Sequence, residues 1–224
     1  MIFNELVFTF NFEYLCDRMI TYTLLAVIAI FSVICFNDRE AMSKYLFYPY
    51  GIKRYKEHYR FLTHAFIHGD IIHLLFNCLA LYSFGLALEE GYFPYFFGEK
   101  LGKLYFLLLF TGGIYAASIT EYLRNKDNSS YSSLGASGAI SSVMFSYIIL
   151  SPKSTIGLFF IPMPGWIAGV VLLGLSVFLI QRKRKGLHQD TISHESHFWG
   201  AIFGILFTVI IKPDSLIQFF QQIF

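Results

Sequence analysis

The sequence predicts an all-α, polytopic membrane protein, a single bundle of six transmembrane helices. Hydrophobic side chains make up 55% of the 224 residues and charged side chains only 14%, whereas soluble domains are roughly a quarter charged. The high hydrophobicity excludes intrinsic disorder, and the net charge of +2 is too small for a nucleic-acid-binding surface. The three cysteines form no CxxC pair, so they indicate neither a disulfide framework nor a redox motif.

Charged residues divide the chain into six uncharged windows of 16 to 28 residues. A helix needs about 20 mostly apolar residues to cross the hydrocarbon core of a bilayer. The windows therefore predict helices over about 19–37, 71–88, 104–121, 136–151, 166–181 and 196–211. We expect residues 1–18 to form an interfacial N-terminal segment and residues 212–224 a C-terminal tail. The first segment contains Glu5, Glu13 and Asp17 before any basic residue, which is not typical of a cleavable signal peptide.

Two connections between the predicted helices stand out. Segment 38–70 combines many charges with a cluster of tyrosine and phenylalanine residues, a composition that favours a position at the membrane surface. After the fourth helix, Pro162, Pro164 and Gly165 predict a short connection, with the fifth helix beginning near Trp166.

Few strongly polar side chains lie inside the windows, and each needs a partner because an unpaired polar group is costly in hydrocarbon. His73 and Asn77 fall in the second helix, Ser137 begins the fourth, and His197 begins the sixth. Even-numbered helices run in the same direction across the membrane, and each polar group lies near the start of its helix. We therefore expect these four side chains to converge near one face of the bilayer.

Small residues predict contact between the fourth and sixth helices. Gly138 follows Ser137 in a run of glycine, alanine and serine, and small residues let helix backbones approach closely in lipid. In the sixth helix, Gly200 and Gly204 share one face with His197. Docking of that glycine face on the fourth helix predicts a hydrogen bond between Ser137 and His197.

A serine paired with a histidine can perform nucleophilic catalysis. Neutral histidine takes the proton from the serine hydroxyl, and attack on a carbonyl then produces an oxyanion that needs hydrogen-bond donors. The Ser137 amide at a helix N-terminus, the Asn77 amide and the His73 imidazole are the candidate donors. Gly135 would let backbone and substrate approach the nucleophile. Because no Asp or Glu lies inside a window, we expect a dyad of Ser137 and His197 without a buried third member.

Three motifs carry a resemblance to a known family. They are His68-x₄-His73-x₃-Asn77, Gly135-Ala136-Ser137-Gly138 and His197-x₂-Gly200-x₃-Gly204. Over residues 21–211, the sequence resembles the rhomboid family of intramembrane serine proteases in its minimal six-helix form. The pair Tyr59-Arg60 is similar to the Trp-Arg stretch of that family, with tyrosine in place of tryptophan.

The resemblance implies that Ser137 is the nucleophile and His197 the general base. His73 and Asn77 would bind the oxyanion together with the Ser137 amide, and His68 would shape the site. It also implies a bilayer environment, transmembrane segments of other proteins as substrates, and no metal or other cofactor. The family suggests a bacterial plasma membrane, with the site opening on the extracytoplasmic side. The distribution of basic residues, 12 on the active-site face and five on the other, favours the cytoplasm for that face.

Other interpretations of the same residues compete with the protease. Ser137 could serve only for helix packing, and Asn77 only for an interhelical hydrogen bond. His194 is a rival base one turn before His197. The seven histidines could suggest a metal site, although zinc hydrolases usually add a carboxylate or an HExxH helix. A transporter would show repeats or intramembrane charges, and the leading non-enzyme alternative is a catalytically silent rhomboid-like binder of transmembrane clients.

Overall fold

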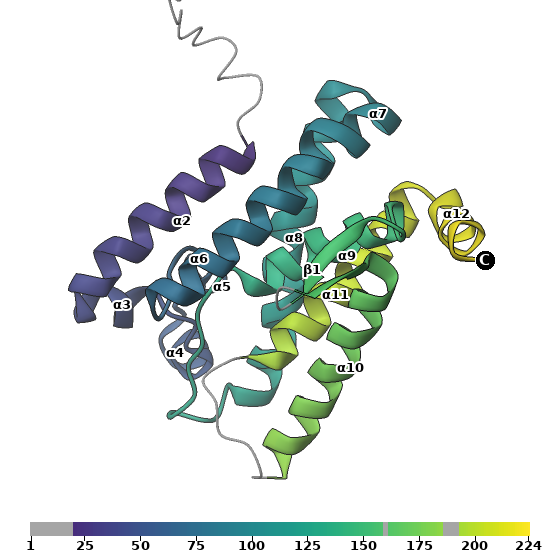
Figure 1. Cartoon of the computed structure of the whole chain (residues 1–224). Coiled ribbons are helices and arrows are strands. Elements are labelled where there is room, and N and C mark those ends of the chain that lie inside the picture. Colours follow the sequence, from purple (N-terminus) through teal and green to yellow (C-terminus); the bar gives the residue numbers. More distant parts are fainter. Residues whose placement is uncertain (1–19, 159–160, 186–192) are drawn as a thin grey trace, which may run out of the picture.

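A computed structural model describes residues 20–158, 161–185 and 193–224, so the predicted segment 1–18 lies outside the described residues. Within them, five helices are long and apolar enough to cross a membrane (Figure 1). These are α2 (Ile20–Asn37), the continuous run Ile71–Phe97, α8 (Glu99–Asn125), α10 (Gly165–Arg184) and α11 (His194–Ile211). The predicted helical membrane fold is confirmed, with five helices of spanning length in the described part against the six predicted.

The helix predicted over 136–151 is α9 (Ser137–Leu150), which has 14 residues and a length of about 21 Å. It lies in the middle of the bundle in Figure 1, and eleven of its residues are buried. Its neighbours approach it closely: a Cβ atom added to Gly113 of α8 would lie 2.2 Å from the Ser142 hydroxyl oxygen. Because the other helices surround α9, its length need not match the bilayer thickness.

The run Ile71–Phe97 begins as an α-helix and then widens into π-helical turns. Its parts are α6 (Ile71–Ala80), η2 (Leu81–Gly85), η3 (Ala87–Tyr92) and α7 (Phe93–Phe97). Within it, the buried carboxylate of Glu89 accepts hydrogen bonds from the Ile20 and Thr21 amides, at 2.8 and 2.7 Å. These are among the first N–H groups of α2, which have no partner within their own helix.

The uncharged windows contain no Asp or Glu, but the spanning helices extend beyond the windows and include buried carboxylates. Glu89 lies within the run Ile71–Phe97, and Glu121 lies within α8; each is 1% exposed. Uncharged windows end at the first charge by definition, whereas a helix packed against other helices can continue through a charged residue that finds hydrogen-bond donors.

Four short helices make up most of segment 38–70. They are α3 (Arg39–Tyr45), α4 (Pro49–Tyr55), α5 (Arg60–Thr63) and the 3₁₀ turn η1 (His64–Phe66). The Arg60 guanidinium holds the segment together by donating to the carbonyls of Ser43 and Leu46, both at 2.8 Å. Phe47 exchanges two backbone hydrogen bonds with Ser133, at 2.8 and 3.0 Å. The segment is therefore tied to the loop that precedes α9.

The short connection predicted after α9 contains an antiparallel hairpin, β1 (Thr155–Leu158) paired with β2 (Ile161–Pro164). Prolines at 162 and 164 are tolerated because a strand with one partner uses only alternate N–H groups for pairing. The predicted C-terminal tail contains a further helix, α12 (Asp214–Ile223). Its apolar residues Leu216, Ile217 and Phe220 recur at helical spacing, a signal that the prediction did not use.

Candidate active site

Ser137 is the first residue of α9 and is half-buried. The chain reaches it through Gly135, whose φ of +113° lies in a region that residues with side chains rarely adopt. The Gly135 N–H donates to the His64 carbonyl at 2.9 Å. This hydrogen bond ties the loop that precedes α9 to segment 38–70. Ser137 therefore enters α9 from a turn that depends on glycine, and its own N–H lies in the first turn, where no intrahelical acceptor exists.

Two of the predicted site residues, His68 and His73, lie directly against this turn. A Cβ atom added to Gly135 would come within 2.8 Å of His73 Cε1 and 3.0 Å of His73 Nε2. His68 is fully buried, and its Nε2 accepts from the Ala136 N–H at 3.5 Å, while Nδ1 lies 2.9 Å from the Ser32 hydroxyl of α2. The two imidazole rings meet edge to face with centroids 4.8 Å apart. His68 and His73 thus pack around the residues that precede Ser137.

The two buried histidines of segment 38–70, His64 and His68, are neutral in the folded protein. Burial, with a smaller contribution from His73, lowers the pKa of His68 to about 3. Burial also lowers the pKa of His64 to about 4, although its Nδ1–H donates to the Arg60 carbonyl at 2.8 Å. Since an amide N–H points at His68 Nε2, the proton of that ring is on Nδ1. These residues act as fixed hydrogen-bonding groups and not as bases.

Asn77 lies one turn beyond His73 on α6 and is 6% exposed. Its Nδ2 donates to the His73 carbonyl at 2.8 Å, which orients the amide group. A side-chain amide carries two N–H donors, so one such contact does not exhaust its capacity. His73 and Asn77 occupy successive turns of α6, and of the two it is His73 that lies against Gly135; the role of Asn77 in the site stays a prediction.

His197 lies in the first turn of α11 and is half-buried. Its N–H donates to the carbonyl of the N-cap residue Ser193 at 3.4 Å, and its ring centroid is 6.2 Å from that of His194. One turn later, a Cβ atom added to Gly200 would lie only 2.0 Å from the Gly138 carbonyl oxygen. The backbones of α9 and α11 are therefore in contact immediately beside Ser137 and His197.

The same glycine face continues along α11. A Cβ atom added to Gly204 would lie 2.2 Å from the carbonyl oxygen of Ser142. The predicted docking of the sixth-helix glycines on the small residues of the fourth helix is therefore confirmed. The hydrogen bond between Ser137 and His197 stays a prediction.

A small, partly open cavity of about 10 Å³ adjoins Ser137, enough for about one water molecule. Its polar lining comes from three parts of the chain: η1, the loop with the first turn of α9, and the start of α11. The residues that supply polar groups include His64, Ser133, Ser137, Ser193 and Ser196. In the described part of the chain, no three His, Cys, Asp or Glu side chains are placed to hold one metal ion.

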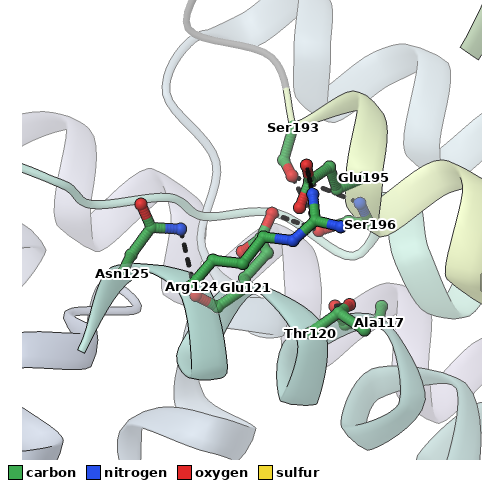
Figure 2. Close-up of polar contacts among 8 residues, drawn as sticks. All are labelled: Ala117, Thr120, Glu121, Arg124, Asn125, Ser193, Glu195 and Ser196. Atoms are coloured by element: carbon green, nitrogen blue, oxygen red, sulfur yellow. Dashed lines mark hydrogen bonds and ion pairs between the residues drawn. The ribbon is translucent and has the colours of Figure 1, made fainter. Parts of the chain in front are cut away.

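The sequence prediction missed a buried carboxylate at the edge of this site (Figure 2). Glu121 of α8 accepts hydrogen bonds from the hydroxyls of Ser196 at 2.7 Å and Ser133 at 2.8 Å, and Tyr131 also hydrogen-bonds it. Burial and the Glu121 charge raise the pKa of Tyr131 above its usual range, so its phenol keeps the proton that it donates. Only the position of Glu121, at the end of the helix predicted over 104–121, could have drawn attention to it.

The chain is similar to known proteins over most of its length. The family model described as Rhomboid domain matches residues 55–214. The chain is 30% identical over 177 residues to RHOMBOID-like protein 12, mitochondrial, of Arabidopsis thaliana, an alignment that covers 74% of this chain and 50% of that protein. It is 42% identical over 84 residues to Rhomboid protease GluP of Bacillus subtilis, which covers 38% of this chain and 14% of that protein.

A third relative is Presenilin-associated rhomboid-like protein A, mitochondrial, of Danio rerio. It is 25% identical over 166 residues, covering 71% of this chain and 40% of that protein. The chain thus spans half or less of the length of these three relatives. The family match extends from the surface segment through α11 and includes all three site motifs. The chain belongs to the rhomboid family.

Proposed function

We propose that this protein is an intramembrane serine endopeptidase in which Ser137 is the nucleophile and His197 the general base. The observation that carries the proposal is the backbone contact between Gly138 and Gly200. Ser137 is the neighbour of the first glycine, and His197 lies one helical turn before the second. Membership of the rhomboid family, which includes relatives named as proteases, supports the same assignment.

In the proposed reaction, the Ser137 hydroxyl oxygen attacks the scissile carbonyl carbon while its proton passes to His197. The oxyanion accepts hydrogen bonds from the Ser137 N–H, His73 and Asn77. The C–N bond then breaks, and His197 gives its proton to the leaving nitrogen, which leaves an ester on Ser137. Water attacks that ester, His197 takes the water proton, and the proton returns to the Ser137 oxygen as the acid product leaves.

The substrate class follows from the environment of the site. A half-buried serine inside a helical membrane bundle is suited to a transmembrane segment of another protein that enters laterally from the bilayer. We propose entry past α10, whose outer face exposes apolar side chains such as Val170 (65%) and Phe178 (54%), while α2 and α8 screen the site elsewhere. The segment must unwind to present a peptide bond, so helix-breaking residues near the cleavage point favour cleavage.

A catalytically silent binder of transmembrane clients is the second candidate, since the relatives include proteins named only as rhomboid-like. The presence of both Ser137 and His197 favours the enzyme. The relatives also include mitochondrial and Bacillus subtilis proteins, and the mitochondrial ones disagree with the expected bacterial plasma membrane. Our proposal for location is therefore limited to a multi-pass protein of a lipid bilayer.

The test is cleavage of a single-span reporter by the purified protein in liposomes. Wild type should cleave, Ser137→Ala and His197→Ala should not, and a chelator should have no effect on wild type. Cleavage by Ser137→Ala would refute the mechanism. If wild type does not cleave, a fluorophosphonate probe decides: labelling of Ser137 in wild type supports an enzyme with another substrate, and absence of labelling supports the silent binder.

A further inference from the structure

Glu121 is a buried acidic residue that the proposed reaction does not use. It is 1% exposed in the last turns of α8, a helix of spanning length. Burying a carboxylate costs several kcal/mol unless donors surround it. Here the hydroxyls of Ser196, Ser133 and Tyr131 supply the hydrogen bonds.

The main donors belong to the two segments that carry the proposed catalytic pair. Ser196 directly precedes His197 in the first turn of α11, and Ser133 lies four residues before Ser137. Glu121 Oε1 accepts from Ser196, and Oε2 accepts from Ser133. One carboxylate therefore connects the start of the helix that carries the base with the loop that leads to the nucleophile.

The position of Ser196 is fixed from two sides. Its hydroxyl is held by Glu121, and its backbone packs on α9: a Cβ atom added to Gly138 would lie 3.4 Å from the Ser196 carbonyl oxygen. Rotation of α11 about its axis would break the hydrogen bond on one side or the close contact on the other. Since His197 is the next residue, the direction of its side chain depends on both.

A second link between α8 and α11 is the ion pair of Arg124 and Glu195, also visible in Figure 2. The Arg124 side chain is 44% exposed, and exposed ion pairs contribute little because water screens them. The hydrogen bond from Ser196 to Glu121 is buried at the carboxylate and is the stronger constraint of the two.

We infer that Glu121 is a positioning residue that acts through the Ser196 hydroxyl to aim His197 at Ser137. This inference rests on the proposed function. Loss of the constraint should lower kcat, because proton transfer needs a closely defined geometry. It should leave KM nearly unchanged, because Glu121 is not among the residues that line the cavity beside Ser137.

The experiment compares Glu121→Leu, Ser196→Ala and the double variant in liposomes, at a temperature at which each is folded. We expect both single variants to lower kcat, by up to about 100-fold, with KM within about twofold of wild type. The rate of fluorophosphonate labelling should fall in parallel, since labelling also needs the base. The double variant should be close to Glu121→Leu alone, because the contact between Ser196 and Glu121 is lost in both single variants and Ser196→Ala adds only the loss of the hydrogen bond to the Ser193 hydroxyl.

Glu89→Leu is the matched control. It also removes a buried carboxylate, but the two hydrogen bonds that Glu89 accepts cap α2. We expect Glu89→Leu to lower the unfolding temperature and to keep the kcat of the folded protein. Glu121→Gln, which keeps a carbonyl acceptor, should restore part of the kcat lost in Glu121→Leu.

Wild-type kcat in folded Ser196→Ala would overturn the inference, and so would a raised KM with unchanged kcat. If Glu121→Leu does not fold, Ser196→Ala decides alone, because that change removes a single hydroxyl. Ser137→Ala in the same assay separates the two proposals. Cleavage by Ser137→Ala would refute the proposed function, whereas its inactivity together with full activity of Ser196→Ala would refute only the role of Glu121.

Discussion

Gly200→Ala is the most direct test of the contact between α9 and α11. The added methyl carbon would lie 2.0 Å from the Gly138 carbonyl oxygen and 2.9 Å from its carbonyl carbon. Real Cβ atoms stay at least 3.0 Å from such atoms, so the two helices must separate by at least 3.0 − 2.0 = 1.0 Å. The obstacle is backbone, which cannot rotate away as a flexible side chain can.

The separation should affect stability and catalysis together. Overpacking of this kind typically costs about 1–3 kcal/mol, and a displacement of about 1 Å between reacting groups can reduce the rate by about 100-fold. The assays are thermal unfolding and reporter cleavage in the same liposomes, with fluorophosphonate labelling as a measure of the dyad alone. We expect Gly200→Ala to unfold at a lower temperature and to label slowly.

Gly174→Ala supplies the control for the change of residue type. Gly174 lies in α10, and a Cβ atom added there meets no atom within 4 Å. Since alanine is a better helix former than glycine, Gly174→Ala should be as stable as wild type or slightly more so, and equally active. Wild-type stability and activity in Gly200→Ala would refute the argument that this close approach sets the geometry of the site.

Three further predictions follow from the site. The pKa values of His64 and His68 are lowered to about 4 and 3 in the folded protein, so stability is full above about pH 6.5 and falls below it as the unfolded chain binds protons. Denaturation should show a loss of about 2 kcal/mol per histidine between pH 7.5 and pH 5, and equal stability at both pH values would contradict the assignment. Gly135→Ala should destabilise by about 1–3 kcal/mol because of the positive φ and should slow cleavage by displacing His73; a wild-type melting temperature would count against this. Asn77→Ala should reduce kcat by about 100-fold if the amide binds the oxyanion, and unchanged kcat in reporter cleavage would exclude that role.

The path of the helices could be predicted well because the bilayer imposes it. Uncharged windows located the end of α2 at Asn37 and the start of α9 to within one residue, since charges are excluded from lipid-facing positions. The same criterion cut α8 short at both ends: it runs over Glu99–Asn125, where the prediction gave 104–121. The hairpin β1–β2 and helix α12 were missed because neither depends on an uncharged window.

The candidate site was predictable as far as it depends on helix direction and glycine spacing. Those two features explain why His73 meets Gly135 and why Gly138 meets Gly200. The position of Glu121 was not predictable, because its partners Ser133 and Ser196 lie 12 and 75 residues away in the chain. Their meeting depends on how the loop before α9 and the first turn of α11 are placed beside α8, which hydrophobic patterning does not specify.

The contact between Glu89 and the start of α2 has a consequence for membrane insertion during synthesis. The Ile20 amide and the carboxylate that holds it are 69 residues apart in the chain, so α2 is made well before its cap. The first amides of α2 must rely on water or headgroups until the run Ile71–Phe97 has inserted beside it in the antiparallel direction. If either helix inserted in the inverted direction, Glu89 would lose both donors, at a cost of several kcal/mol. The cap therefore favours the correct topology of the first two helices over the inverted one.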